Sequence, residues 1–472
     1  MYKAYVTYVT NIRPAANADR LNACEVFGNT TIIDKTITED TLILYLPSDG
    51  QISVEFGEKN NLFRRKDDAG NNVGGFIDPD KRNITAIRLR GNRSDGLVLP
   101  ISCLNYCYAH GDASIELRAG DVIDGLVNGH EICCKYIPCS STRRSTVTEG
   151  NRTRKKKVAT APLFREHADT EQLAYNLDAF KAGDEIEITL KMHGTSQRTG
   201  YLPVLQGYAD TWPCRVGNAF RHIMRKMGCY HGEDVHDGEP IYDYGYVSGT
   251  RRVVLENYEG GFYGDNEFRE QHSKVFEGKL WKGETVYYEV VGFTTSGAPI
   301  MASASNSKLN DKEFIKQYGE TTRFSYGCDA NGVNGRPQSD IYVYRMTMTN
   351  PDGEVVEYTP DFMRYRCEQM AVKTVPVLWK GTIPENPGSY NDPTISAGEW
   401  IKNVAERFYD GPDPIGKTHV REGVVVRITN RPKFAAYKHK NWSFKCLSGI
   451  AIADAEASGA TEGMSEDVLA EM

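Results

Sequence analysis

Residues 185–196 read EIEITLKMHGTS, an alternating run that is followed by a lysine and a glycine. Apolar and polar side chains alternate from Glu185 to Leu190, which is the pattern of a β-strand with one buried face. Lys191 leaves the end of that strand, and Gly194 follows where a backbone without a side chain allows close approach. The pattern predicts an amine presented at a strand edge, where it can act as a nucleophile toward a phosphate.

Further short motifs follow Lys191 in order along the chain. They are SGTRR at 248–252, YYEVVG at 287–292, IYVYRM at 341–346, REGVVV at 421–426 and YKHK at 437–440. Besides Glu185–Leu190, strands are expected at Thr285–Val291, Ile341–Met346 and Gly423–Ile428, and helices at Phe220–Met227, Asp311–Tyr318 and Trp400–Phe408. We therefore expect an α+β domain around a largely antiparallel sheet, with long insertions at 202–240 and 347–420.

The first 140 residues have a different pattern of short strands with Gly, Asn and Asp between them. The strands are expected at Ala4–Val9, Cys24–Phe27, Thr30–Ile33, Leu42–Tyr45, Ile84–Leu89 and Leu97–Leu99. This spacing is typical of a small closed or nearly closed β-barrel. The two patterns agree with the length of 472 residues, which exceeds what one hydrophobic core usually organises.

The composition excludes several classes of protein. With 40% hydrophobic and 25% charged residues, the chain is neither disordered throughout nor fibrous. No apolar run approaches the length of a membrane span, and the first residues do not resemble a signal peptide, so we expect a cytoplasmic protein without a membrane partner. The eleven cysteines lack the paired Cys-x2-Cys spacing of a zinc site.

The net charge of −7 is unevenly distributed. Residues 141–157 contain one acidic residue and seven basic ones, namely Arg143, Arg144, Arg152, Arg154, Lys155, Lys156 and Lys157. Residues 451–472 contain six acidic residues and no basic one. The basic segment is an expected linker whose cations can follow a phosphate backbone, so the negative total does not exclude a polyanionic partner.

The series from Lys191 to Lys440 resembles the covalent nucleotidyltransferases, the superfamily of ATP-dependent DNA and RNA ligases and mRNA capping enzymes. DNA ligases and capping enzymes typically have Asp and Arg where this chain has His193 and Ser196, and the KMHGTS form is similar to the RNA ligases. Residues 11–26, NIRPAANADRLNACEV, and 88–97, RLRGNRSDGL, resemble an OB domain that binds tRNA. An OB domain ahead of the catalytic domain matches RNA ligases of the Naegleria type.

This resemblance implies an ATP-dependent RNA ligase that joins 3′-hydroxyl and 5′-phosphate ends through lysyl-AMP and RNA-adenylate, in RNA repair. The implied catalytic residues are Lys191, His193, Lys438 and Lys440; the implied ATP or AMP contacts are Gly194, Arg251, Arg252, Glu289, Tyr344 and Glu422. Glu289 and Glu422 would also hold Mg2+ or Mn2+, and the basic segment 141–157 would bind RNA. Many ligases have Glu two residues before the nucleophile, where this chain has Thr189, with Glu187 two places earlier.

The expected organisation is an OB-like RNA-binding domain at 1–140, a basic linker at 141–160, a nucleotidyltransferase domain at 161–450 and an acidic tail at 451–472, in a monomer. Three alternatives stay open: a capping-type guanylyltransferase, a DNA ligase on the same scaffold, and a non-catalytic RNA-binding protein. His193 and Ser196 argue against the first two. The reactive residues argue against the third.

Overall fold

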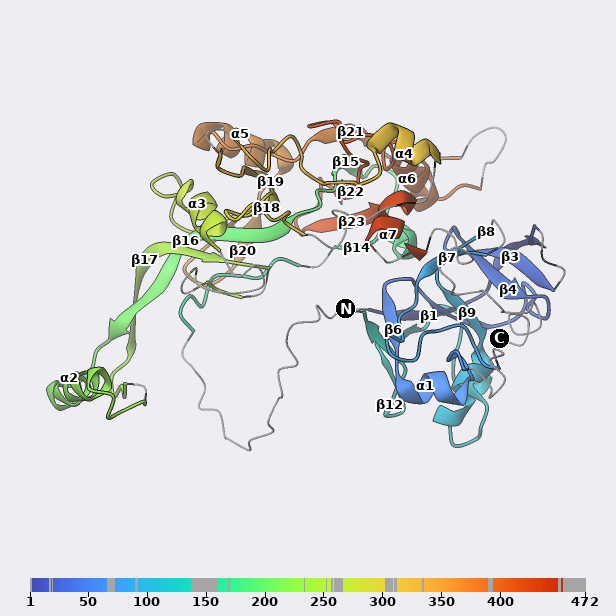
Figure 1. The fold of residues 1–472 in the computed structure, drawn as a ribbon, viewed down its shortest axis with the longest axis horizontal. Helices are drawn as coiled ribbons and strands as arrows, with labels where there is room; N and C mark the ends of the chain where they lie inside the picture. Colours follow the sequence, from blue (N-terminus) through green and yellow to red (C-terminus); the bar gives the residue numbers. More distant parts are fainter. Residues whose placement is uncertain are drawn as a thin grey trace.

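The computed structural model describes residues 2–452 except 17, 19, 66–72, 90–91, 137–158, 169, 233, 252, 256–257, 259–265, 302–308, 310–311, 333–334, 389–393 and 449–450. The described chain is an α+β structure in which most strand pairs are antiparallel. Figure 1 shows the N-terminal strands in blue at one end and a long two-stranded arm that projects from the other. None of the described helices is long and apolar enough to cross a bilayer.

The N-terminal part contains several small sheets. One has the order β10 (Val122–Ile123), β1 (Ala4–Thr7), β5 (Ile43–Leu46) and β9 (Leu97–Pro100), and a second joins β2 (Thr10–Pro14), β3 (Leu21–Val26) and β4 (Asn29–Asp34). Shorter pairs are β13 (Cys133–Lys135) with β6 (Gly50–Ile52) and β11 (Leu126–Val127) with β12 (His130–Glu131). The helix α1 (Val54–Lys59) begins at Ser53, whose side chain accepts a hydrogen bond from the backbone of Phe56.

The expected barrel is not confirmed. Strand positions agree with the sequence patterns at β3, β4, β5 and β9, but the pairings between described strands form separate sheets and do not join into a ring. The alternating apolar pattern predicts where strands lie, whereas closure depends on strand tilt and stagger, which the pattern does not specify. The OB-like assignment and the domain boundaries therefore stay predictions.

Two five-stranded sheets make up the larger part of the chain. The first has the order β14 (Glu171–Gln172), β23 (Ala435–Lys440), β22 (Gly423–Ile428), β15 (Glu185–Leu190) and β21 (Val377–Thr382). The second has the order β17 (Pro240–Gly249), β16 (Thr195–Tyr208), β18 (Glu284–Gly292), β19 (Ser339–Thr349) and β20 (Val355–Glu357). Strands β15 and β22 match the predicted ranges, and the expected antiparallel arrangement is confirmed except for the parallel pair of β14 and β23.

The helices of this part cover the two sheets. They are α3 (Glu267–Lys274), α4 (Lys312–Tyr318), α5 (Pro360–Met370), α6 (Ala397–Glu406) and α7 (Trp442–Leu447). Residues of α3 and α5 share a hydrophobic core with β18 and β19, and residues of α6 share one with β15 and β22. The insertion expected at 202–240 extends β16 and β17 into the arm, whose tip is the helix α2 (Trp212–Lys226).

The N-terminal sheets contact residues that flank the strands of the first five-stranded sheet. The ring of Tyr175, which precedes β15, lies 5.1 Å from Tyr5, 5.7 Å from Phe27 and 5.9 Å from Tyr45 between centroids. Lys445 on α7 also forms an ion pair with Asp95. At the far end of the chain β24 (Ala451–Ile452) adds parallel to β7 (Ala86–Leu89), which pairs with β8 (Asn92–Ser94). These contacts hold residues from both ends of the chain together.

We predict that Tyr175→Ala lowers the free energy of unfolding by about 2 kcal/mol, because it removes an aromatic ring from a cluster of three others. Tyr175→Phe is the matched control, since it keeps the ring and loses only a 3.4 Å contact with the hydroxyl of Tyr45. Urea unfolding of the two variants measures the difference. Equal stability of the Ala and Phe variants would show that the ring does not hold the two parts together.

Candidate active site

The site lies at one edge of the first five-stranded sheet, where β15 and β23 end and β22, the strand between them, begins. Lys191 directly follows β15, Gly423 begins β22 and Lys440 ends β23. The backbone N–H of Lys191 donates to the carbonyl of Gly423 at 3.0 Å, and Gly423 is the register partner of Lys440. The antiparallel register therefore brings together residues that lie more than two hundred positions apart in sequence.

Two glycines allow this close approach. Gly423 has a φ of 147°, and a Cβ placed on it would lie 2.0 Å from the carbonyl oxygen of His439. A Cβ on Gly194 would lie 2.3 Å from the carbonyl oxygen of Val290. The glycines of both motifs are thus required by the packing of the backbone, and any contact between Gly194 and a nucleotide stays a prediction.

An ion pair holds the predicted nucleophile. Lys191 Nζ lies 2.6 Å from Glu422 Oε1, and His193 Nδ1 lies 3.6 Å from the other carboxylate oxygen. Burial opposes ionisation of Glu422, but the charge of Lys191, the proximity of His193 and the charge of Lys440 together lower its pKa to about 2. The carboxylate is therefore ionised at neutral pH, and its Oε2 is a buried atom without a hydrogen-bond partner.

His193 is held in place by aromatic neighbours. Its ring lies 4.9 Å from Phe324 and 4.8 Å from Phe444 between centroids, and its backbone N–H donates to the Tyr326 hydroxyl at 2.6 Å. The side chain is buried and directed at Glu422. The structure therefore gives His193 a positioning contact with the carboxylate that holds Lys191.

Glu289 is a second carboxyl group near Lys191, and its pKa is shifted in the opposite direction from that of Glu422. It lies on β18, opposite Ser196 of β16 in the strand register. Burial and, to a smaller extent, the carboxylate of Glu422 raise the pKa of Glu289 to about 7, against the opposing charges of Lys191 and Arg251. One carboxyl group of the site is thus fully ionised and the other is partly protonated at neutral pH.

Two further lysines, both on β23, lie near Lys191. Lys438 and Lys440 alternate with His439, so their side chains leave the same face of the sheet. Burial and the charge of Lys440 lower the pKa of Lys438 to about 7, and burial also lowers the pKa of Lys440. The charge of Lys191 contributes to both shifts, which places the three amines within electrostatic reach of one another.

A cleft of about 760 Å³, including open solvent at its mouth, lies beside this cluster. Of the predicted site residues, Lys191, Arg251, Glu289 and Tyr344 line it. Gly194, Glu422, Lys438 and Lys440 do not line it, and the contact of any of these residues with a nucleotide stays a prediction. The hydroxyl of Tyr344 is 2.9 Å from that of Ser196, which fixes the aromatic ring of β19 against the strand that follows the lysine motif. Lys438 lines a second cavity, which shares Thr170 with the cleft.

Several lining residues were not predicted from the sequence. They include His167, Thr170, Arg427 and Phe434. The guanidinium of Arg427 lies 5.0 Å from the centre of the Phe434 ring, and the ring of His167 lies 5.7 Å from the same ring. These residues belong to no short motif, so only the folded chain brings them to the cleft.

Glu187 also lines the cleft, from the position two residues before Thr189. Its carboxylate is 2.8 Å from Arg364 and 3.2 Å from Lys380, so both cations compete with any ligand for it. Glu187 therefore does not simply take over the nucleotide contact that many ligases make with a Glu at the position of Thr189. Arg252, the seven basic residues of segment 141–157 and the tail from 453 lie outside the described residues.

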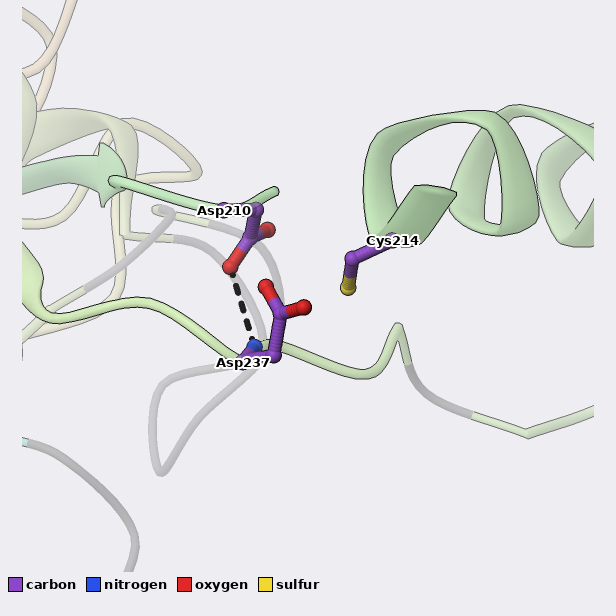
Figure 2. A group of neighbouring side chains, drawn as sticks. All are labelled: Asp210, Cys214 and Asp237. Carbon is purple, nitrogen blue, oxygen red and sulfur yellow. Dashed lines mark hydrogen bonds between the residues drawn. The ribbon is translucent and has the colours of Figure 1, made fainter. Parts of the chain in front are cut away.

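Among the described residues, one group of three side chains has the spacing of metal ligands, and it lies on the arm. Figure 2 shows Asp210, Cys214 and Asp237 at the start of α2. Their polar atoms are already used in hydrogen bonds: Asp237 accepts from the backbone N–H of Thr211 at 2.9 Å, and Asp210 accepts from the N–H of Asp237 at 3.1 Å. The group anchors the helix, and we assign it no metal.

We predict that Glu289→Gln raises the free energy of unfolding by about 1 to 3 kcal/mol near pH 8 and changes it little near pH 4. The pKa of Glu289 is raised to about 7 from 4.5, so the folded chain binds this proton more tightly, and ionisation costs stability as the pH rises between those values. Thermal unfolding at the two pH values measures the effect. A variant that is less stable at the higher pH would show that the charge of Glu289 stabilises the fold.

Comparison with known proteins supports the fold. No family model and no curated protein matches the sequence. The structure is similar to that of Naegleria gruberi RNA ligase with PPi, with 16% identity and a TM-score of 0.53 over 93% of this chain and 97% of that one. A mutant of that ligase with AMP and Mn matches 94% of this chain and 97% of its own at 16% identity and a TM-score of 0.52.

A second mutant of the ligase, with ATP and Mn, covers 95% of this chain and 99% of its own, with 16% identity and a TM-score of 0.53. The resemblance predicted from the motifs is therefore confirmed at the level of the fold. Over nearly its whole length, this chain has the fold of Naegleria gruberi RNA ligase.

Proposed function

We propose that this protein is an ATP-dependent RNA ligase that seals 3′-hydroxyl and 5′-phosphate ends. The observation that carries the proposal is the position of Lys191: it lies at the edge of the cleft, paired with Glu422 and close to Lys438, Lys440 and Glu289. The fold shared with RNA ligase structures that hold ATP, AMP and PPi supports the same reading.

The proposed reaction has three balanced steps. In the first, the neutral amine of Lys191 attacks the α-phosphorus of ATP; a P–N bond forms, the bond from that phosphorus to the oxygen shared with the β-phosphate breaks, pyrophosphate leaves, and the nitrogen gives up one proton to solvent. In the second, an oxygen of the RNA 5′-phosphate attacks the same phosphorus, the P–N bond breaks, and the lysine leaves as an amine that takes a proton from solvent. In the third, the 3′-hydroxyl loses its proton and attacks the 5′-phosphate, which forms the phosphodiester and releases AMP.

The cations of β23 suit the negative charge that these steps develop. A buried lysine with a pKa of about 7 regains its proton when an anion arrives, so Lys438 can become a cation as the phosphates bind. Lys440 and Arg251 add further positive charge to the same region. Fixed cations around the α-phosphate and the leaving pyrophosphate would stabilise the transition state electrostatically.

The carboxyl groups suit a divalent cation. Glu422 Oε2 is buried without a hydrogen-bond partner, and Glu289 is near enough for its pKa to be raised by the charge of Glu422. Hard oxygen ligands of this kind, together with substrate phosphates, are what Mg2+ or Mn2+ uses. A bound metal would neutralise phosphate charge, and it would compete with Lys191 for Glu422, which frees the amine from its ion pair.

The remaining assignments extend the proposal to the substrates. Tyr344 would contact adenine, and Arg251 the ribose or a phosphate, because both line the cleft. The OB-like part at 1–140 and the basic segment 141–157 would hold RNA with affinity that falls as salt rises. RNA repair in a cytoplasm, by a monomer, is the proposed setting.

We predict that the intact chain gains one AMP when it is incubated with ATP and Mg2+, and that Lys191→Ala abolishes the gain. Lys316→Ala is the control, because Lys316 lies on α4 and its side chain is exposed. Intact-protein mass spectrometry measures the adduct, with GTP in a parallel sample. Addition of GMP would favour the capping-type alternative, and no adduct with either nucleotide would contradict the ligase proposal.

A further inference from the structure

The tip of the arm carries a helix whose apolar side faces outward. Trp212, Val216, Phe220, Ile223 and Met227 have exposed fractions of 77%, 49%, 62%, 54% and 67%. At 3.6 residues per turn these five positions fall within an arc of about 80°. An apolar stripe of this kind normally packs against the core of its own protein, and Figure 1 shows α2 remote from the body of the molecule.

Hydrogen bonds on the opposite face hold the helix in this orientation. Asn218 donates to the carbonyl of Val235 at 2.6 Å and accepts from its N–H at 3.0 Å, and Arg225 pairs with Asp234 at 2.7 Å. Cys214 adds a contact from the same face. The polar face is therefore bound to the helix's own return loop, and the apolar stripe is left for another surface.

The charge of the helix identifies the kind of surface. Residues 212–226 include four Arg or Lys and no acidic residue. Arg215 and Lys226 are exposed, and at 100° per residue they lie along one flank of the stripe. An apolar stripe with cations beside it fits a partner that offers apolar contact and negative charge together.

Of the candidate partners, an anionic lipid surface meets both requirements. RNA supplies the charge, and its bases can stack on Trp212 and Phe220, but stacking gives no partner to the aliphatic Val216, Ile223 and Met227. A second copy supplies the apolar stripe, but antiparallel pairing would bring the cationic flanks of Arg215 and Lys226 face to face. Phospholipid headgroups accept the cations while the acyl region takes the aromatic and aliphatic side chains.

We propose that α2 is an interfacial helix that docks the protein on an anionic phospholipid bilayer. The helix would lie in the plane of the surface, with the stripe inserted and Arg215 and Lys226 among the headgroups. The arm would then hold the cleft away from the surface. The expectation of no membrane partner rested on the lack of a spanning segment, and a surface helix requires none.

The test is flotation of the full-length protein with vesicles of phosphatidylcholine alone and of phosphatidylcholine mixed with phosphatidylglycerol. We predict flotation with the mixed vesicles, weaker binding with the neutral ones, and an affinity at least about tenfold lower for the double variant Phe220→Asp and Ile223→Asp. Arg215→Gln with Lys226→Gln should abolish the preference for the anionic lipid. Val356→Asp is the control, because Val356 is 59% exposed on β20, away from the arm.

Circular dichroism of each variant confirms that it folds, and none of these positions belongs to the cleft. Failure of the protein to float with the anionic vesicles would overturn the proposal. An equal loss of vesicle binding in Val356→Asp and in the Phe220→Asp and Ile223→Asp variant would also overturn it. So would a lower RNA affinity of the double variant with unchanged lipid binding, or a dimer in light scattering that the double variant converts to a monomer. Adduct formation with ATP is measured separately, so the lipid result stands whether or not the ligase proposal holds.

Discussion

The ion pair between Lys191 and Glu422 is the constraint on which the site depends. Lys191 directly follows β15 and Glu422 directly precedes β22, and the two charged groups lie 2.6 Å apart with the carboxylate almost fully buried. Removing one partner of such a pair leaves an uncompensated charge in a desolvated place, at a cost of about 3 to 5 kcal/mol. The pair therefore fixes the amine at the edge of the cleft, and the proposed reaction requires another cation to take the place of the amine at the carboxylate.

The surroundings of this pair tune the other ionisable groups. Burial raises the pKa of Glu289 to about 7, and burial with a neighbouring cation lowers that of Lys438 to about 7. Both groups therefore change charge most readily near neutral pH, in a place where phosphate and metal charges are expected to arrive. Groups whose pKa is strongly shifted by burial and by a charged neighbour are typical of catalytic sites.

The strands that carry the site, and the glycines beside them, could be predicted from the sequence. The alternation in EIEITL and the run GVVVRI predict β15 and β22 to the residue, and the motif glycines mark the places where backbones approach closely. His167 and Phe434 could not be predicted, because no local pattern distinguishes a cleft residue from a core residue. The exposed stripe of α2 was also missed, since the same periodicity usually indicates a buried face.

The N-terminal part shows the limit of the same reasoning. Its strands follow from alternation and turn residues, yet closure of a barrel depends on how strands far apart in sequence are staggered. The contacts of Tyr175 and Lys445 with the N-terminal sheets likewise join residues that no motif connects. Local chemistry thus predicts elements and reactive residues, whereas tertiary contacts decide which of them meet.

The most direct test of the central claim is to locate the nucleotide on the chain. After incubation with ATP and Mg2+, the protein is digested, and tandem mass spectrometry identifies the residue that carries AMP. We expect AMP on Lys191 alone, although Lys438 and Lys440 lie within electrostatic reach. AMP on either of those lysines, with Lys191 unmodified, would contradict it.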